Sequence, residues 1–106
     1  MGIILERIAK EILSWTDVTS EPHRFGGIEF RLNKREMGHI HGDKLADLPF
    51  PMDTRNKLVN SGQVSPHHVL PQSGWISFWI KGEKDIPAVV KLFKMRYDYL
   101  KPKQST

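Results

Sequence analysis

Histidine, the side chain best suited to chemistry near neutral pH, occurs twice in closely spaced pairs in this 106-residue chain. The first pair lies in Gly38-His39-Ile40-His41-Gly42-Asp43, where one residue separates the two imidazoles. The second is the adjacent pair His67-His68. Side chains two residues apart on a β-strand share a face, so the first stretch predicts that His39 and His41 point the same way.

Metal binding is the first chemistry that this spacing suggests. A separation of two residues along a strand places the Cα atoms about 6.5 to 7 Å apart. This spacing allows two imidazoles to converge on one ion, with zinc as the expected metal. The chain has no cysteine, so any metal site must use histidine and carboxylate. We expect His39 and His41 as ligands, with Asp43, His67 or His68 completing the site.

A pocket for a small anionic ligand is the second hypothesis, and the one we favour from the sequence. Imidazole and guanidinium groups bind carboxylates and phosphates, and pockets usually combine a few such groups with aromatic walls. Phe50 and Trp79 are expected to contribute to the apolar wall. The expected ligand-binding residues are His39, His41, Asp43, Arg55, His67, His68 and Trp75.

Acid–base catalysis is a third hypothesis, in which Asp43 or Asp47 orients a histidine. Serines are available as nucleophiles, but none occupies a Gly-x-Ser-x-Gly elbow. Asp47, followed by Leu48-Pro49, is expected to cap a turn. The sequence therefore assigns no reaction. The serines considered are Ser61, Ser65, Ser73 and Ser77.

The charge balance favours an anionic partner, because sixteen Lys and Arg against twelve Asp and Glu leave a net charge of +4. The basic residues are scattered, except for a C-terminal group that is typical of a solvated helix face. The Asn33-Lys34-Arg35 turn would place basic side chains at a hairpin tip, which makes nucleic acid the alternative partner. An exposed edge strand that recruits a protein partner is a further alternative.

The length suits one domain with one hydrophobic core, which we place at residues 1–102 with a disordered tail at 103–106. No apolar run reaches the roughly 20 residues of a membrane span, so no membrane partner is expected. The apolar stretch at residues 1–5 is interrupted by Glu6 and is too short for a signal peptide. The lack of cysteine fits a reducing compartment. We therefore expect a cytoplasmic protein.

Apolar residues every three or four positions predict amphipathic helices over residues 3–15 and 85–102, the second ending at Pro102. A shorter helix over 53–59 is expected, with Asp53 as its N-cap and a turn at 60–62. Residues 17–27 are expected to form a loop carrying solvent-exposed His23 and Arg24. Residues 63–71 are expected to be extended.

Alternating apolar and polar residues predict strands over 28–32, 36–41 and 74–80, of which the last is expected to be central. A further strand over 45–50, the third in chain order, ends at its prolines, so it belongs at an edge or ends early. In 36–41, alternation puts Met37 on the face of His39 and His41, and Ile40 on the other. The order α-β-β-β-α-β-α indicates an α+β fold whose antiparallel sheet carries the N- and C-terminal helices on one face.

The chain resembles the small bacterial "luciferase family" of domains of unknown function over residues 25–100. The chain is much shorter than the roughly 250 residues of a flavin-dependent barrel. The resemblance therefore identifies related domains but does not imply light emission. It is also similar to MmcQ/YjbR-like domains, in the tryptophan strand before a closing helix with Tyr97-Asp98, which implies a CyaY-like fold and DNA binding. The residues that carry the first resemblance are Gly38-His39-Ile40-His41-Gly42, Asp47-Leu48-Pro49-Phe50-Pro51, Arg55, Leu58, Pro66-His67-His68-Val69-Leu70-Pro71 and Ser73-Gly74-Trp75.

Overall fold

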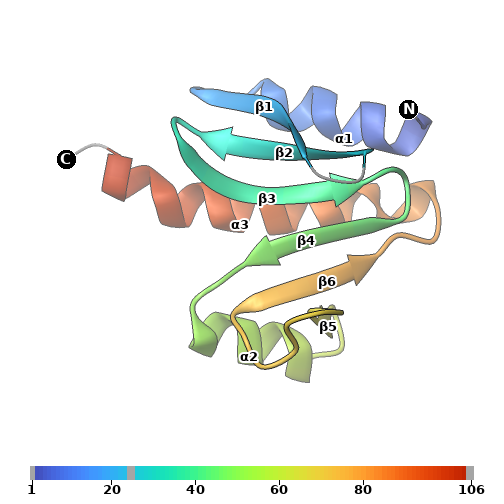
Figure 1. Ribbon diagram of the computed structural model, residues 1–106, viewed down its shortest axis with the longest axis vertical. Coiled ribbons are helices and arrows are strands. Elements are labelled where there is room, and N and C mark those ends of the chain that lie inside the picture. The colour runs from blue at the N-terminus through green and yellow to red at the C-terminus, as the bar shows by residue number, and fades with distance from the viewer. Residues whose placement is uncertain (1, 24–25, 105–106) are drawn as a thin grey trace.

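Six strands and three α-helices make up the described part of the chain, residues 2–23 and 26–104 of this computed structural model (Figure 1). The strands are β1 (Val18–His23), β2 (Gly27–Leu32), β3 (Arg35–His41), β4 (Leu45–Pro49), β5 (Ser65–Pro66) and β6 (Trp75–Trp79). The helices are α1 (Ile3–Leu13), α2 (Met52–Asn60) and α3 (Ile86–Gln104). Every neighbouring pair is antiparallel, in the order β1-β2-β3-β4-β6-β5, which confirms the predicted α+β fold with an antiparallel sheet.

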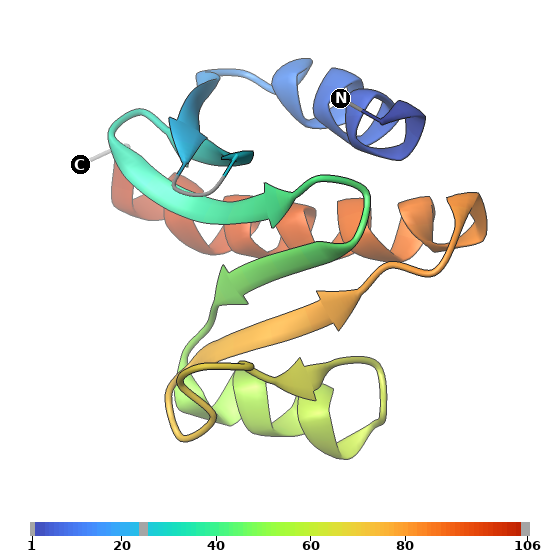
Figure 2. The ribbon, with the colours of Figure 1, turned by 45° about the vertical axis from the view of Figure 1, so that its right-hand side comes forward.

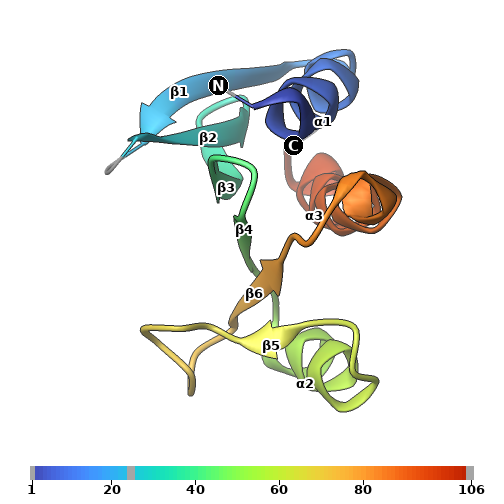
Figure 3. The same cartoon turned by 90° about the vertical axis from the view of Figure 1, so that its right-hand side faces the viewer.

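The two long helices, α1 and α3, cover the same face of the sheet, as predicted. Figure 3 looks along the sheet and shows both on one side, and Figure 2 shows α3 running behind β3. The core lies between sheet and helices and includes the fully buried side chains of Ile8, Phe30, Ile40 and Phe93. The chain between β5 and β6 extends on the opposite face, which no described helix covers (Figure 3). No described helix is long and apolar enough to cross a membrane.

Two strands were absent from the prediction. Residues 17–27 were expected to form a loop, but β1 is an edge strand paired with β2 along its whole length. Alternation does not reveal β1, because all its side chains except Val18 and His23 are exposed, and Pro22 is tolerated only at an edge. His23 therefore lies on a strand, and Arg24 falls outside the described residues. The second missed strand, β5, has only two residues.

A β-bulge in β3 overturns the predicted position of Met37. Phe30 pairs with Gly38 but Arg31 pairs with Glu36, so Met37 is the extra residue. Its side chain is fully buried in the core instead of sharing a face with His39. Gly38 follows, where a Cβ atom would come within 2.8 Å of the Asp47 carbonyl oxygen on β4.

Several element ends differ from the prediction. β4 ends early at Pro49, but it lies inside the sheet between β3 and β6. Helix α2 begins at Met52 after Pro51, so Asp53 is not its N-cap and instead accepts the Thr54 N–H. Helix α3 follows a 3-10 turn at Glu83–Asp85 and continues past Pro102 to Gln104. Near a helix end a proline removes one hydrogen bond of the last turn, so it does not stop the helix. Of the predicted tail, residues 105–106 lie outside the described part.

Candidate functional site

The strand register places one polar residue from each strand in a row on the face of the sheet opposite α1 and α3. His39 on β3 lies opposite Asp47 on β4, which in turn lies opposite Ser77 on β6. Side chains directly opposite each other on paired strands share a face and interact. We call this set the polar row. It consists of Glu21, Glu29, His39, Asp47, Ser77 and Ser65.

Asp47 is the centre of the polar row and is fully buried. Its Oδ1 accepts a 2.7 Å hydrogen bond from Ser77 Oγ, whereas its Oδ2 is buried without a hydrogen-bond partner. Around Oδ2 lie the Nε2 atoms of His39 at 3.4 Å, His41 at 3.6 Å and His67 at 3.6 Å. These distances are at or beyond the limit of a hydrogen bond. Burial raises the pKa of Asp47, but His39 and Ser77 outweigh it and leave this pKa below its ordinary value.

His39 lies between two carboxylates. Its Nδ1 is 2.7 Å from Glu36 Oε2, and its Nε2 faces Asp47. Burial lowers the pKa of His39, but the interactions with Asp47 and Glu36 outweigh burial and raise this pKa to about 9. His39 is therefore an imidazolium at neutral pH.

His41 reaches the same carboxylate because Gly27 leaves room for its ring. A Cβ atom on Gly27 would lie 3.0 Å from His41 Nδ1 and 3.1 Å from the Ile40 carbonyl oxygen. The rings of His39 and His41 are nearly perpendicular, at 78°, with centroids 5.0 Å apart. Burial, reinforced by the charge of His39, lowers the pKa of His41, so this imidazole is neutral near pH 7.

His67 comes from the segment between β5 and β6, and nine-tenths of its side chain is buried. Its Nδ1 accepts the backbone N–H groups of Val69 at 3.1 Å and Leu70 at 3.0 Å. An accepting Nδ1 carries no proton, so the ring proton of neutral His67 is on Nε2, facing Asp47. Burial lowers the pKa of His67 despite the attraction of Asp47, which favours this neutral form.

His68 is joined to Asp47 through Ser77. The Ser77 hydroxyl donates its proton to Asp47, so its oxygen accepts from His68, whose Nδ1 is 3.2 Å away and whose backbone nitrogen is 3.3 Å away. The Nδ1 of His68 therefore carries the ring proton. About a third of the His68 side chain is exposed, and its ring lies 6.0 Å from that of Trp79.

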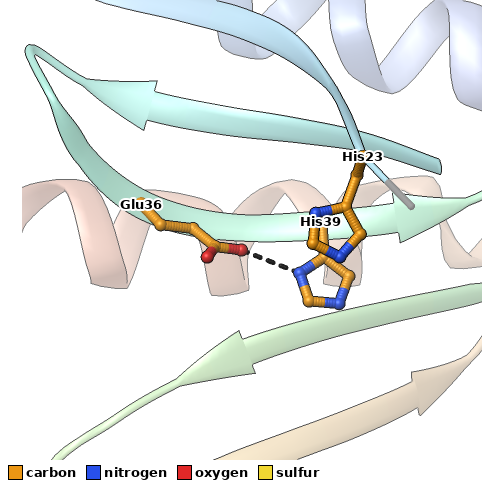
Figure 4. A group of neighbouring side chains, drawn as sticks. All are labelled: His23, Glu36 and His39. Atoms are coloured by element: carbon orange, nitrogen blue, oxygen red, sulfur yellow. Dashed lines mark hydrogen bonds and ion pairs between the residues drawn. The ribbon is translucent and has the colours of Figure 1, made fainter.

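His23, expected on an exposed loop, is half-buried and stacks on His39 (Figure 4). The ring centroids are 3.9 Å apart and the planes are 15° from parallel. Its Nδ1 lies 3.1 Å from Glu29 Oε1. Imidazole lone pairs lie in the ring plane, so two stacked rings cannot direct them at one ion.

Three groups of side chains in the described residues have ligand atoms within 4.8 Å of one another. The first is His23, Glu36 and His39; the second is His39, His41 and Asp47; and the third is Asp47, His67 and His68. Stacking removes the first group as a chelating site. In the third group the His67 Nδ1 accepts two backbone N–H groups, which leaves the ring proton on Nε2, and the His68 Nδ1 is bonded to Ser77. The second group offers two inclined imidazoles and an unpartnered carboxylate oxygen.

Of the residues predicted from the sequence, the structure brings the four histidines and Trp75 together. The Trp75 ring lies 5.3 Å from that of His39 and 5.9 Å from that of His67. Trp79 lies on the same face but is half exposed, and Phe50 is buried in the hydrophobic core rather than in a pocket wall.

Asp43 and Arg55 are engaged in other contacts. Asp43 Oδ1 accepts the Leu5 N–H at 2.9 Å, so it caps the N-terminus of α1. Arg55 donates to the carbonyl oxygen of Pro71 at 2.6 Å, at the end of the segment that carries His67. Asp43 belongs to none of the three ligand groups.

Sequence reasoning missed the central role of Asp47 and the contributions of Glu36, Ser77 and His23. One signal was available for Asp47: a carboxylate within the otherwise apolar strand Leu45–Pro49 is costly to bury unless it has a partner. Asp47 was instead expected to cap a turn. No such signal marks Glu36, because its position depends on the bulge at Met37.

Comparison with known families gives one result: residues 34–96, more than half of the chain, match the family model described as Luciferase domain. This segment begins in the turn between β2 and β3 and ends within α3. No curated protein and no solved structure matches the chain. The similarity to MmcQ/YjbR-like domains stays a prediction.

Proposed function

The chain belongs to the Luciferase domain family, and we propose that this domain binds a divalent metal ion such as Zn²⁺ through His39, His41 and Asp47. All three residues lie within the matched segment, whereas His23 lies outside it. Histidine nitrogen and carboxylate oxygen are suitable ligands for this class of metal in a chain without cysteine.

The observation that carries the proposal is the buried Oδ2 atom of Asp47. It is a buried, charged oxygen in the middle of a sheet that accepts no hydrogen bond, and the His39 imidazolium lies 3.4 Å from it. A metal ion bound at Oδ2 would satisfy this oxygen directly. An anion bound directly among the histidines would instead approach this carboxylate, so the geometry supports a metal ion better than direct anion binding.

The distances agree with tetrahedral coordination. Zinc lies about 2.0 to 2.1 Å from nitrogen and oxygen ligands, which places the ligand atoms about 3.3 Å from one another. The Nε2 atoms of His39 and His41 lie 3.4 and 3.6 Å from Asp47 Oδ2. These contacts are long for hydrogen bonds and suitable for the edges of such a tetrahedron.

Glu36 supports the same assignment. Histidines that bind metal through Nε2 usually donate the Nδ1 proton to a carboxylate or carbonyl, which fixes the orientation of the ring. The 2.7 Å contact between Glu36 and His39 Nδ1 has this arrangement. Three protein ligands with one open position are typical of catalytic rather than structural zinc sites.

Metal titration of the EDTA-treated protein tests the proposal. We expect one Zn²⁺ or Co²⁺ per chain after gel filtration, and a Co²⁺ visible spectrum typical of four-coordination. His39→Ala and His41→Ala should reduce metal affinity by more than the 10- to 100-fold that loss of an outer hydrogen-bond partner costs. Asp47→Asn provides the matching test at the carboxylate.

His23→Ala and His68→Ala are the matched controls, since each removes a histidine of the cluster that is not a proposed ligand. Circular dichroism establishes that each variant is folded. If the protein bound no stoichiometric metal, or if the ligand and control variants lost metal affinity equally, the cluster would be only a buried network of ion pairs. Nucleic-acid binding by the turn at residues 33–35 stays a separate prediction, for which steep salt dependence is the test.

A further inference from the structure

We infer that the open position of the proposed metal site takes an anionic oxygen of a phosphate or carboxylate group, and that His67 donates a hydrogen bond to it. This inference rests on the proposed metal site. It adds the class of ligand that the site accepts and assigns His67 as a donor rather than as a metal ligand.

The hydrogen bonds of His67 determine which of its nitrogens carries the proton. The Val69 and Leu70 N–H groups both point to Nδ1, at 3.1 and 3.0 Å, so Nδ1 acts as an acceptor. A neutral imidazole has one proton, which must then be on Nε2. A protonated Nε2 has no lone pair for a metal, so His67 is a donor in this conformation.

The free N–H of His67 faces the centre of the proposed site. Its Nε2 lies 3.6 Å from Asp47 Oδ2, the oxygen proposed to hold the ion, and this distance is too long for a hydrogen bond. An oxygen ligand on the ion is therefore a suitable acceptor for this N–H. The ring is nine-tenths buried, and the two backbone donors fix its orientation before a ligand arrives.

Charge favours an anion at this position. A divalent ion held by two neutral imidazoles and one carboxylate has a residual charge of +1, which an anionic oxygen neutralises. Trp75 lies against both His39 and His67, at 5.3 and 5.9 Å between ring centroids, and places an apolar ring beside this position. Electrostatic attraction is stronger in such surroundings than in bulk water.

His67→Asn provides a sharp test. The asparagine Oδ1 can take the place of Nδ1 as acceptor for the Val69 and Leu70 N–H groups, while the Nε2–H is removed. We expect the Co²⁺-loaded wild-type protein to change its visible spectrum on titration with inorganic phosphate or acetate. The His67→Asn variant should bind Co²⁺ with the same stoichiometry but bind the responding anion at least tenfold more weakly, since a hydrogen bond to a charged group contributes about 1.5 to 3 kcal/mol.

His23→Asn is the matched control and should retain the wild-type anion affinity. A response to phosphate alone or to acetate alone identifies which group the site prefers, and both results support the inference. Stoichiometric Co²⁺ binding without any anion response, or an unchanged anion affinity in folded His67→Asn, overturns this inference and leaves the metal site standing. Failure of the wild-type protein to bind Co²⁺ overturns both proposals.

Discussion

Glu36 and His39 are three residues apart on β3, yet their side chains are joined at 2.7 Å on one face of the sheet. In a regular strand such residues point to opposite faces. The bulge at Met37 adds one residue to β3, which returns Glu36 to the face of His39 and sends Met37 into the core. A local irregularity of the backbone thus supplies the carboxylate that orients the central histidine.

Glu36→Gln should lower the pKa of His39 from about 9, because it removes one of the two carboxylates that stabilise the imidazolium. The measurement is an NMR titration of the His39 ring protons in the metal-free protein. Zinc affinity should fall 10- to 100-fold, because the orienting partner of a ligand is lost. Glu29→Gln, which affects His23 and Arg31, is the control. An unchanged His39 titration in Glu36→Gln would contradict this account.

The stability of the metal-free protein should depend on pH through His39. Its pKa of about 9 in the folded state exceeds the ordinary value of 6.5, so its contribution is complete below pH 6.5 and lost as pH rises through 9. At about 1.4 kcal/mol per pKa unit the loss approaches roughly 3 kcal/mol. Urea unfolding of wild type and His39→Gln from pH 6 to 9.5 measures the difference. A constant difference between the two proteins would refute the assignment.

His41 and His67 should make the stability of the metal-free protein depend on pH in the opposite direction. Burial lowers the pKa of both in the folded state, so their contribution is present above pH 6.5 and lost as pH falls below it. Acidification below pH 6.5 should therefore destabilise wild type more than a His41→Gln, His67→Asn double variant. Urea midpoints at pH 5 and pH 7 check this, and equal pH sensitivity in the two proteins would speak against it.

Gly27→Ala should displace His41 without unfolding the sheet. The new Cβ atom would meet His41 Nδ1 at 3.0 Å and the Ile40 carbonyl oxygen at 3.1 Å, so the ring or the strand must shift. We expect zinc affinity to fall by roughly tenfold or more, as for other losses of ligand orientation. Gly82→Ala is the control, because no atom lies within 4 Å of a Cβ there and its backbone is extended. Equal zinc affinities in the two variants would rule out this role for Gly27.

Asp43→Ala should separate the stability of α1 from the metal site. The variant loses the cap on the Leu5 N–H, which typically costs about 0.5 to 2 kcal/mol of unfolding free energy. Zinc stoichiometry should stay unchanged, because Asp43 is not a proposed ligand. Thermal unfolding and metal analysis of the same sample provide both values. Loss of zinc binding in folded Asp43→Ala would restore Asp43 to the site.

The sequence by itself determined the class of the fold and part of the site. Helical spacing predicted α1 and α3, and strand alternation predicted β2, β3 and β6 and put His39 and His41 on one face. These patterns are readable because each depends on residues close together in the chain, with one side buried and the other exposed. The exposed edge strand β1 has no such contrast and was missed.

Only the tertiary structure decided what the histidines surround. The register between strands put Asp47 opposite both His39 and Ser77, and the hydrogen bonds in the segment after β5 brought His67 to the same carboxylate. Pairing between strands and the bulge at Met37 depend on contacts between residues distant in the chain, which local periodicity does not encode. The sequence therefore identified the imidazoles, and the packing of β4 between β3 and β6 supplied the buried charge on which they converge.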